Sequence, residues 1–216
     1  MDRRKLEEII AGGVDFQIQA ILEKAWVLFK ARAAFHIGFM FVIGSIQAVF
    51  TNYLEEFLSI YTILLAPALV AGFYLVANRI SQGEYVDFQN YFDGFKYWLL
   101  VVTINLVSGI ITVLGIIALI IPGIYLGVGY LFAMLFGVFG GFDFWTSMEY
   151  SRRLVHTNWW KFFGFILVLV LLNIAGLLAL LVGLLVTVPV TYLSIYLLFE
   201  ELTSDAAEAI EIEEKV

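Results

Sequence analysis

The sequence predicts an all-α membrane protein that crosses the bilayer six times. Of its 216 residues, 62% are hydrophobic and only 14% are charged, whereas soluble domains carry about 25% charged residues. A soluble globule of this size could not bury so much apolar surface, so we expect lipid to be its solvent. Two further observations support this class: four long stretches lack charged residues, and all basic residues can be placed on one side of a membrane.

The four charge-free stretches set the number of crossings. They are Ala33 to Leu54, Phe57 to Asn78, Tyr97 to Phe142 and Phe162 to Phe199. A membrane-spanning helix needs about 20 apolar residues, so each of the first two stretches fits one crossing. The third would make a helix of about 69 Å and the fourth one of about 57 Å, at roughly 1.5 Å per residue. Each is therefore expected to fold back as a hairpin, which gives six spans in three pairs.

The basic residues support this count and orient the chain. Under the six-span interpretation all 12 Lys and Arg residues fall on one side, which the positive-inside rule makes the cytoplasm, together with both termini. The opposite side is expected to hold short turns at Asn52 to Phe57, near Ile120 to Gly123, and between Asn173 and Leu185. The last turn is not located more closely because three signals compete there: Asn173, Gly176 and Gly183. A five-span alternative, with the C-terminal tail outside, stays open.

A four-residue sequence, VDFQ, occurs at 14–17 and again at 86–89. Each copy precedes an aromatic segment that leads into a charge-free stretch, and a third Asp-Phe pair at 143–144 has the equivalent place before the fourth stretch. An Asp at the start of a helix can accept hydrogen bonds from the first N–H groups. We therefore expect three helices to begin at Asp15, Asp87 and Asp143.

The segments after these Asp residues are predicted to be amphipathic helices lying in the headgroup plane. In the second segment, apolar residues recur at the i, i+3, i+4, i+7 spacing of one helical face, at Phe88, Tyr91, Phe92 and Phe95. In the first, the same face is formed by Ile18, Ile21, Leu22 and Ala25, with Trp26 and Phe29 beside it. Each segment is followed by a cation at the start of the next span, namely Arg32, Lys96 and Lys161.

The three prolines extend this pattern, because Pro67, Pro122 and Pro189 each fall in the second half of a hairpin. Proline starts or kinks a membrane helix. The chain is thus predicted to be one integral membrane domain over residues 1–200, made of three tandem units of an amphipathic helix plus a helical hairpin. The units cover about 14–80, 85–142 and 142–200, and an acidic cytoplasmic tail covers 201–216.

Part of the chain resembles a known family. The sequence IPGIY at 121–125, Asp143, SMEYSRRL at 147–154 and NWWK at 158–161 resemble the six-helix membrane domain that precedes the catalytic domain of some glycerophosphodiester phosphodiesterases. That domain also occurs alone in uncharacterised bacterial and archaeal membrane proteins. The resemblance covers roughly residues 84 to 200 and departs from the family pattern at Tyr150 and Thr157. It implies a membrane module of the prokaryotic cytoplasmic membrane, without the phosphodiesterase activity.

Two groups of residues are candidates for function. A cationic patch beside the membrane face would contact lipid headgroups, because Arg offers a fork of donors to an oxyanion; the alternative is that its charges only fix topology. This patch is Arg152, Arg153, His156 and Lys161. A second group of polar side chains inside the spans would form a polar cluster or make interhelical hydrogen bonds of about 1 kcal/mol. This group is Gln47, Asn105 and Asn173.

The sequence gives no sign of catalysis, of a metal site or of a cofactor. No ionisable residue lies inside a predicted span, which argues against proton relays and ion sites. His36 and His156 are expected at the cytoplasmic interface with one wet edge, and no further ligands accompany them at a metal-site spacing. Ser151 and His156 lie five residues apart and do not share a helix face, so they form a poor nucleophile and base pair.

The sequence therefore predicts a non-enzymatic membrane module. The first hypothesis is an accessory or scaffold subunit that binds another membrane protein or a copy of itself. The alternative is a protein that binds lipid or another amphiphile, including a transporter or channel with a cavity between the hairpins. Nucleic acid is not an expected partner, because no basic face is long enough to follow a phosphate backbone.

Overall fold

The computed structural model describes residues 1–179 and 182–213, with side chains up to Ala207. Within these ranges the chain is all-helical, and six helical segments are long and apolar enough to cross a membrane. They are Ala33–Tyr53, Glu55–Ser81, Phe88–Ala118, Ile120–Gly140, Trp159–Leu178 and Leu184–Ala207. The all-α class and the six segments predicted from the charge-free stretches are confirmed, and the chain has the character of a multi-pass membrane protein.

Two helices precede the first hairpin, α1 (Arg3–Gly12) and α2 (Ile18–Ala31). The first span is α3 (Ala33–Tyr53), and the chain turns back at Leu54, within the predicted turn. The second span is a continuous helical segment whose hydrogen-bonding pattern changes along its length. Its parts are η1 (Glu55–Phe57), α4 (Leu58–Ile60), the π-helical turn η2 (Tyr61–Leu65) and α5 (Ala66–Ser81).

The second hairpin is preceded by the 3₁₀ helix η3 (Phe88–Tyr97). Its first span, α6 (Trp98–Ala118), is joined to α7 (Ile120–Gly129) by the single extended residue Leu119, just before the predicted turn. The returning span is interrupted at 130–132 and resumes as α8 (Ala133–Gly140).

The third hairpin follows α9 (Phe144–His156) and consists of α10 (Trp159–Leu178) and α11 (Leu184–Glu213). Of the three competing turn signals only Gly183 lies in the turn, since Asn173 and Gly176 are inside α10. Helix α11 runs through residue 200, so the predicted boundary between membrane domain and tail falls inside one helix. Leu202 and Ala206 are buried, and the start of the predicted tail therefore packs against the protein.

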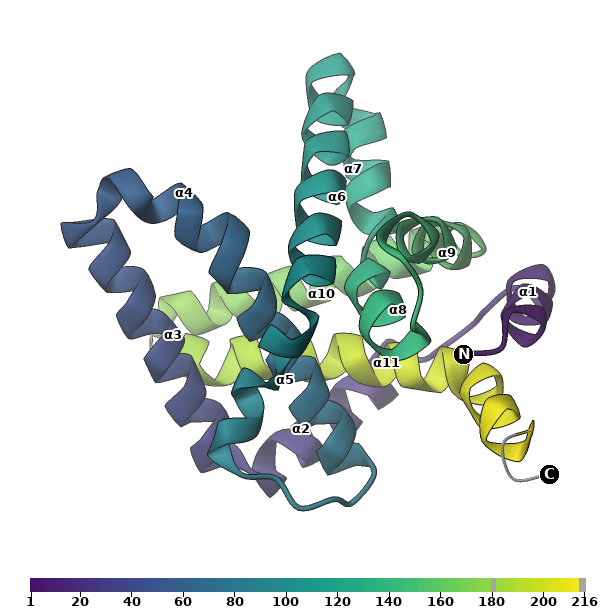
Figure 1. Cartoon of the computed structure of the whole chain (residues 1–216), viewed down its shortest axis with the longest axis horizontal. Helices are drawn as coiled ribbons and strands as arrows, with labels where there is room; N and C mark the ends of the chain where they lie inside the picture. The colour runs from purple at the N-terminus through teal and green to yellow at the C-terminus, as the bar shows by residue number, and fades with distance from the viewer. Residues whose placement is uncertain (180–181, 214–216) are drawn as a thin grey trace.

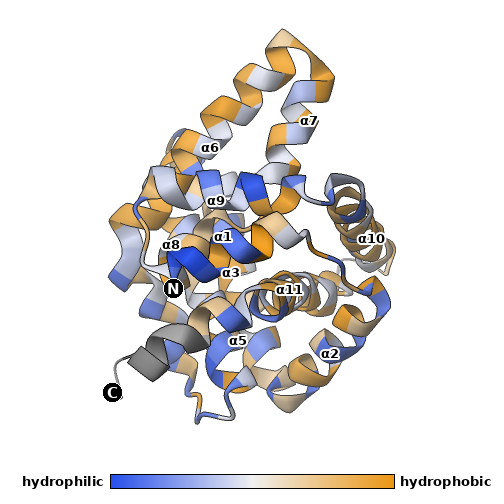
Figure 2. Ribbon diagram, turned by 90° about the vertical axis from the view of Figure 1, so that its right-hand side faces the viewer, coloured by the Kyte–Doolittle hydropathy of each residue, from blue (hydrophilic) through white to orange (hydrophobic). Residues whose placement is uncertain are grey.

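The three consecutive pairs of apolar segments diverge. In Figure 1 the α6–α7 hairpin rises from the molecule, α10 and α11 run across it, and α3 leans with α4 and α5 in a third direction. The α6–α7 hairpin also stands clear in Figure 2, and Ile117, Ile120 and Ile121 near its tip are strongly exposed. These hairpins do not form a single parallel bundle.

Within each hairpin the second span is the buried one. In an apolar 18-residue window, 17%, 17% and 22% of residues are buried in the three first spans, against 56%, 44% and 50% in the three second spans. Each second span also contains one of the three prolines. Burial therefore follows the same alternation three times. The core combines residues of α5, α8 and α11 with residues of α2, α3, η3 and α10.

The predicted helix starts hold in two of three places. Asp87 accepts from Phe88 N at 2.7 Å at the start of η3, and Asp143 accepts from Trp145 N and Thr146 N at the start of α9. The prediction is wrong for Asp15, because α2 begins only at Ile18, after Gln17. The Asp15 carboxylate instead pairs with Lys161.

The predicted apolar face after the second VDFQ is also wrong in detail. Residues three apart share a face in a 3₁₀ helix, so Tyr91 and Gly94 are buried while Phe92 and Phe95 are exposed. Gly94 crosses α5 at Gly72, where an added Cβ would lie 1.8 Å from Tyr91 O. This backbone contact requires glycine. In α2, by contrast, Ile21, Ala25 and Phe29 form the buried face.

Candidate functional site

The cations of the predicted headgroup patch are already paired within the described residues. Arg152 donates from Nε and Nη2 to Glu149 at 3.0 and 2.7 Å. Arg153 donates from Nη1 and Nη2 to Glu7 of α1 at 2.7 and 2.5 Å. Lys161 pairs with Asp15, which precedes α2. The four predicted residues are therefore not a free cationic patch, because carboxylates neutralise its three formal charges.

These ion pairs also change the pKa values of the carboxyl groups. The hydrogen bond from Arg153 lowers the pKa of the Glu7 carboxyl, with burial opposing. The hydrogen bond from Lys161 lowers the pKa of Asp15 in the same way. Both acids are therefore ionised at neutral pH, and each remains matched to its cation.

The fourth predicted residue, His156, lies in a different environment. Its Nδ1 shares a 2.8 Å hydrogen bond with the hydroxyl of Tyr125 in α7, and the two rings meet edge to face. Tyr125 stacks on Trp159, with centroids 5.9 Å apart, and Trp159 stacks on Phe163 at 5.2 Å. Three parallel aromatic rings thus connect α7 with the start of α10.

These rings form one wall of a groove of about 720 Å³. Its lining residues come from α7, from the end of α9 and from the start of α10, and Figure 2 shows α9 below the α6–α7 hairpin with α10 to its side. Ligand sites commonly have volumes of about 300–1,000 Å³ and apolar walls with a few polar groups. The lining residues are Ile121, Ile124, Tyr125, His156, Thr157, Asn158, Trp159, Trp160 and Phe163.

The groove joins the two sequence motifs that carried the family resemblance. IPGIY supplies the α7 wall and NWWK supplies the α10 wall, although Tyr125 and His156 are 31 positions apart. Sequence reasoning selected His156 but missed Tyr125, Trp160 and Phe163 as members of one site. The aromatic density of NWWK was the available signal, but it was used only for the family resemblance.

The predicted intramembrane polar cluster is not formed. Gln47 hydrogen-bonds Thr51 of its own helix at 3.3 Å, and Asn105 lies exposed on α6. Asn173 donates to Thr191 across the α10–α11 contact at 2.7 Å. The three side chains lie on three different hairpins, and only Asn173 makes the interhelical bond that the sequence offered as the alternative.

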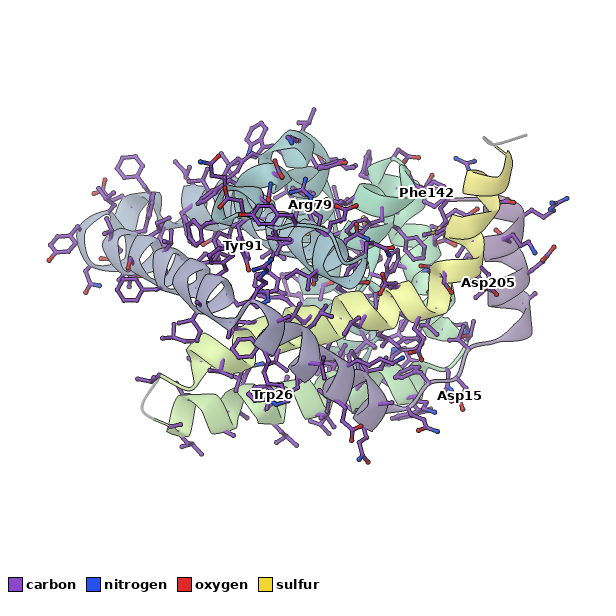
Figure 3. The ribbon with its side chains drawn as sticks, turned by 90° about the horizontal axis from the view of Figure 1, so that it is seen from below. Asp15, Trp26, Arg79, Tyr91, Phe142 and Asp205 are labelled. Atoms are coloured by element: carbon purple, nitrogen blue, oxygen red, sulfur yellow. The ribbon has the colours of Figure 1, made fainter. Side chains whose placement is uncertain are left out.

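His36 was expected at a wet interface, and this expectation is wrong. Its side chain is fully buried, and Nδ1 shares a 2.7 Å hydrogen bond with Tyr91, a residue that Figure 3 shows among the interior side chains. Phe29 and Phe73 lie against the imidazole. His36 is therefore part of the aromatic core between α2, α3, α5 and η3.

The Ser151 side chain makes hydrogen bonds to the backbone. Its buried hydroxyl donates to Gly129 O at 2.7 Å and accepts from Phe132 N at 3.0 Å. These two groups flank the interruption between α7 and α8, where regular helical bonding stops. The hydroxyl thus stabilises a broken span, and it is not poised as a nucleophile beside His156.

Among the described residues, no group of three His, Asp or Glu side chains is placed to hold a metal ion. Comparisons with protein-family models, with curated proteins and with solved structures give no match. The resemblance to the membrane domain of glycerophosphodiester phosphodiesterases therefore stays a prediction.

Proposed function

We propose that this protein is a non-enzymatic multi-pass membrane protein that binds an amphiphile in the groove between α7 and α10. The observation that carries the proposal is the groove itself, whose volume of about 720 Å³ is lined by apolar and aromatic side chains and has a small polar end. Such a combination suits a molecule with a hydrocarbon chain and a polar head.

The chain of the ligand would lie along Ile121, Ile124 and Phe163. Its head would lie near the Tyr125 hydroxyl and His156, where hydrogen-bonding groups are present. Trp159 and Trp160 flank this end, and tryptophan favours the boundary between headgroups and hydrocarbon. The role thus becomes binding, presentation or transfer of an amphiphile, which was the alternative derived from the sequence.

The topology is part of the same proposal. We infer three tandem units, both termini in the cytoplasm, and α2, η3 and α9 near the headgroups of a prokaryotic cytoplasmic membrane. The threefold alternation of exposed first spans and buried second spans supports the tandem units. The placement of all basic residues on one side supports the orientation.

Photolabelling tests the groove. We expect a single-chain amphiphile with a diazirine on its acyl chain to label the purified protein saturably at residues 121–125 and 156–163. Ile121→Trp, which adds bulk at the rim of the groove, should reduce that labelling several-fold. The matched control is Ile117→Trp, which is similarly exposed on α6 but does not line the groove. Labelling spread evenly over α3, α6 and α10 would contradict the proposal.

A role as an accessory or scaffold subunit stays a second candidate. It is favoured by the α6–α7 hairpin, which projects with exposed apolar side chains on its outer half. This role requires a membrane-protein partner or a second copy of the chain in a gently solubilised sample. Crosslinks from that hairpin only to lipid would argue against it.

A further inference from the structure

The polar end of the groove carries no formal charge. Its hydrogen-bonding groups are those of Tyr125, His156, Thr157 and Asn158, and none of its described lining residues is Asp, Glu, Lys or Arg. A phosphate moved into such a site loses hydration, and the guanidinium beside the Tyr125 hydroxyl, that of Arg152, is already paired with Glu149, so the loss is unfavourable. An uncharged head avoids this cost.

The cations nearest to the groove are already neutralised by carboxylates. Arg152 uses two of its nitrogens on Glu149, and Lys161 is paired with Asp15. A headgroup phosphate would have to displace a carboxylate or lie beside it, and like charges at that distance repel. The pairs therefore act against anionic ligands.

The neutral groups retain the capacity to bind a hydroxyl. Thr157 Oγ1 donates to Leu154 O and Asn158 Nδ2 donates to Val14 O. The Thr157 oxygen and Asn158 Oδ1 can still accept. The described hydrogen bond of the His156 ring involves Nδ1, which leaves Nε2 for a ligand. A hydroxyl both donates and accepts, so it can satisfy groups of either kind.

We propose that the ligand is a single-chain amphiphile with an uncharged, hydroxyl-bearing head, such as a monoacylglycerol. This inference rests on the proposed function and names the ligand class of the same groove. One acyl chain with a small head matches a groove of about 720 Å³, whereas a two-chain phospholipid exceeds the usual range of such sites.

Competition against a photoreactive monoacylglycerol on the full-length protein tests the class. The competitors share one acyl chain and differ in the head: monoacylglycerol, lysophosphatidylglycerol and the free fatty acid. We expect half-protection by monoacylglycerol at a concentration at least about 10-fold lower than for either anion, because a buried charge without a partner costs at least that factor. Equal or better protection by an anion overturns this inference while the groove proposal stands. Labelling that no competitor reduces overturns both.

Glu149→Gln provides an independent test, since it leaves Arg152 without its carboxylate. We expect lysophosphatidylglycerol to protect at a several-fold lower concentration in this variant, with monoacylglycerol unchanged. Glu55→Gln, in the turn after α3, is the matched control and should alter neither. If Glu149→Gln leaves protection by the anion unchanged, the ion pair does not set ligand charge, and the inference fails.

Discussion

The first and second spans of each hairpin have similar composition, but the second spans bury more of their residues. Few residues of α3, α6 and α10 are buried, whereas the spans that end in α5, α8 and α11 are about half buried. Hydropathy alone does not separate them, because the second span of the second hairpin has the same mean hydropathy as α3, 1.8. In two of the second spans a glycine lets another element approach closely, since an added Cβ would lie 1.8 Å from Tyr91 O at Gly72 and 2.8 Å from Ile104 Cδ1 at Gly137. In membranes, such close packing contributes to helix association.

The largest expected effect on stability comes from replacing a glycine in one of the second spans. Gly72→Ala on buried α5 places a Cβ 1.8 Å from Tyr91 O, and a backbone oxygen cannot move aside as a side chain can. We expect a loss of about 4 kcal/mol or more in the free energy of unfolding, or no folded protein. Thermal unfolding in detergent measures it.

Gly109→Ala is the matched change on exposed α6, where no atom lies within 4 Å of the added Cβ. It should leave stability unchanged or raise it by up to about 1 kcal/mol, since alanine favours helix. Equal destabilisation by both changes would contradict the division into inner and outer spans.

The second expected effect compares two leucines. Leu193 of α11 is fully buried and Leu171 of α10 is 56% exposed. Leu193→Ala should cost about 3 kcal/mol because it leaves a cavity, while Leu171→Ala should cost no more than about 0.5 kcal/mol. The melting temperatures should differ by roughly 2–4 °C per kcal/mol. A larger shift for Leu171→Ala would show that the outer spans are packed against something else.

The smallest expected effect concerns the pair between α1 and α9. The pKa of Glu7 is lowered from 4.5 in the folded chain, so its ionised form stabilises folding above about pH 4.5, and this contribution is lost as pH falls through the lower folded pKa. Glu7→Gln should therefore lower the melting temperature at pH 7, by an amount equivalent to at most about 1 kcal/mol.

The difference between Glu7→Gln and the natural chain should shrink as the pH approaches 3.5 and in high salt. Glu8→Gln, on the exposed neighbouring position, is the control and should have little effect at either pH. A difference that grows with acidification would mean that Glu7 does not act through its charge.

Much of the fold could be predicted from the absence of charge. The spans, the turn at Leu54 and the need for two further hairpins follow from where Lys, Arg, Asp and Glu do not occur. The interruption between α7 and α8 could not, because its missing backbone bonds are supplied by Ser151 from another helix. The same holds for the pairing of Glu7 with Arg153, which lie 146 positions apart.

The candidate site was predictable only in part. His156 and Lys161 were selected for their charge, yet one lines a neutral groove and the other is paired with Asp15. Residue type gives the chemistry of a side chain, but its partner depends on how the α1–α2 connection crosses the start of α10. That crossing leaves no periodic signal in the sequence.

The Ser151 hydroxyl limits the substitutions that position 151 can accept. One oxygen serves a carbonyl and an amide from different turns of the same span, and among common side chains only serine and threonine combine donor and acceptor at so short a reach. A chain that replaced it by alanine would leave Gly129 O and Phe132 N without this partner, at a cost of about 1–3 kcal/mol for each buried group left unsatisfied.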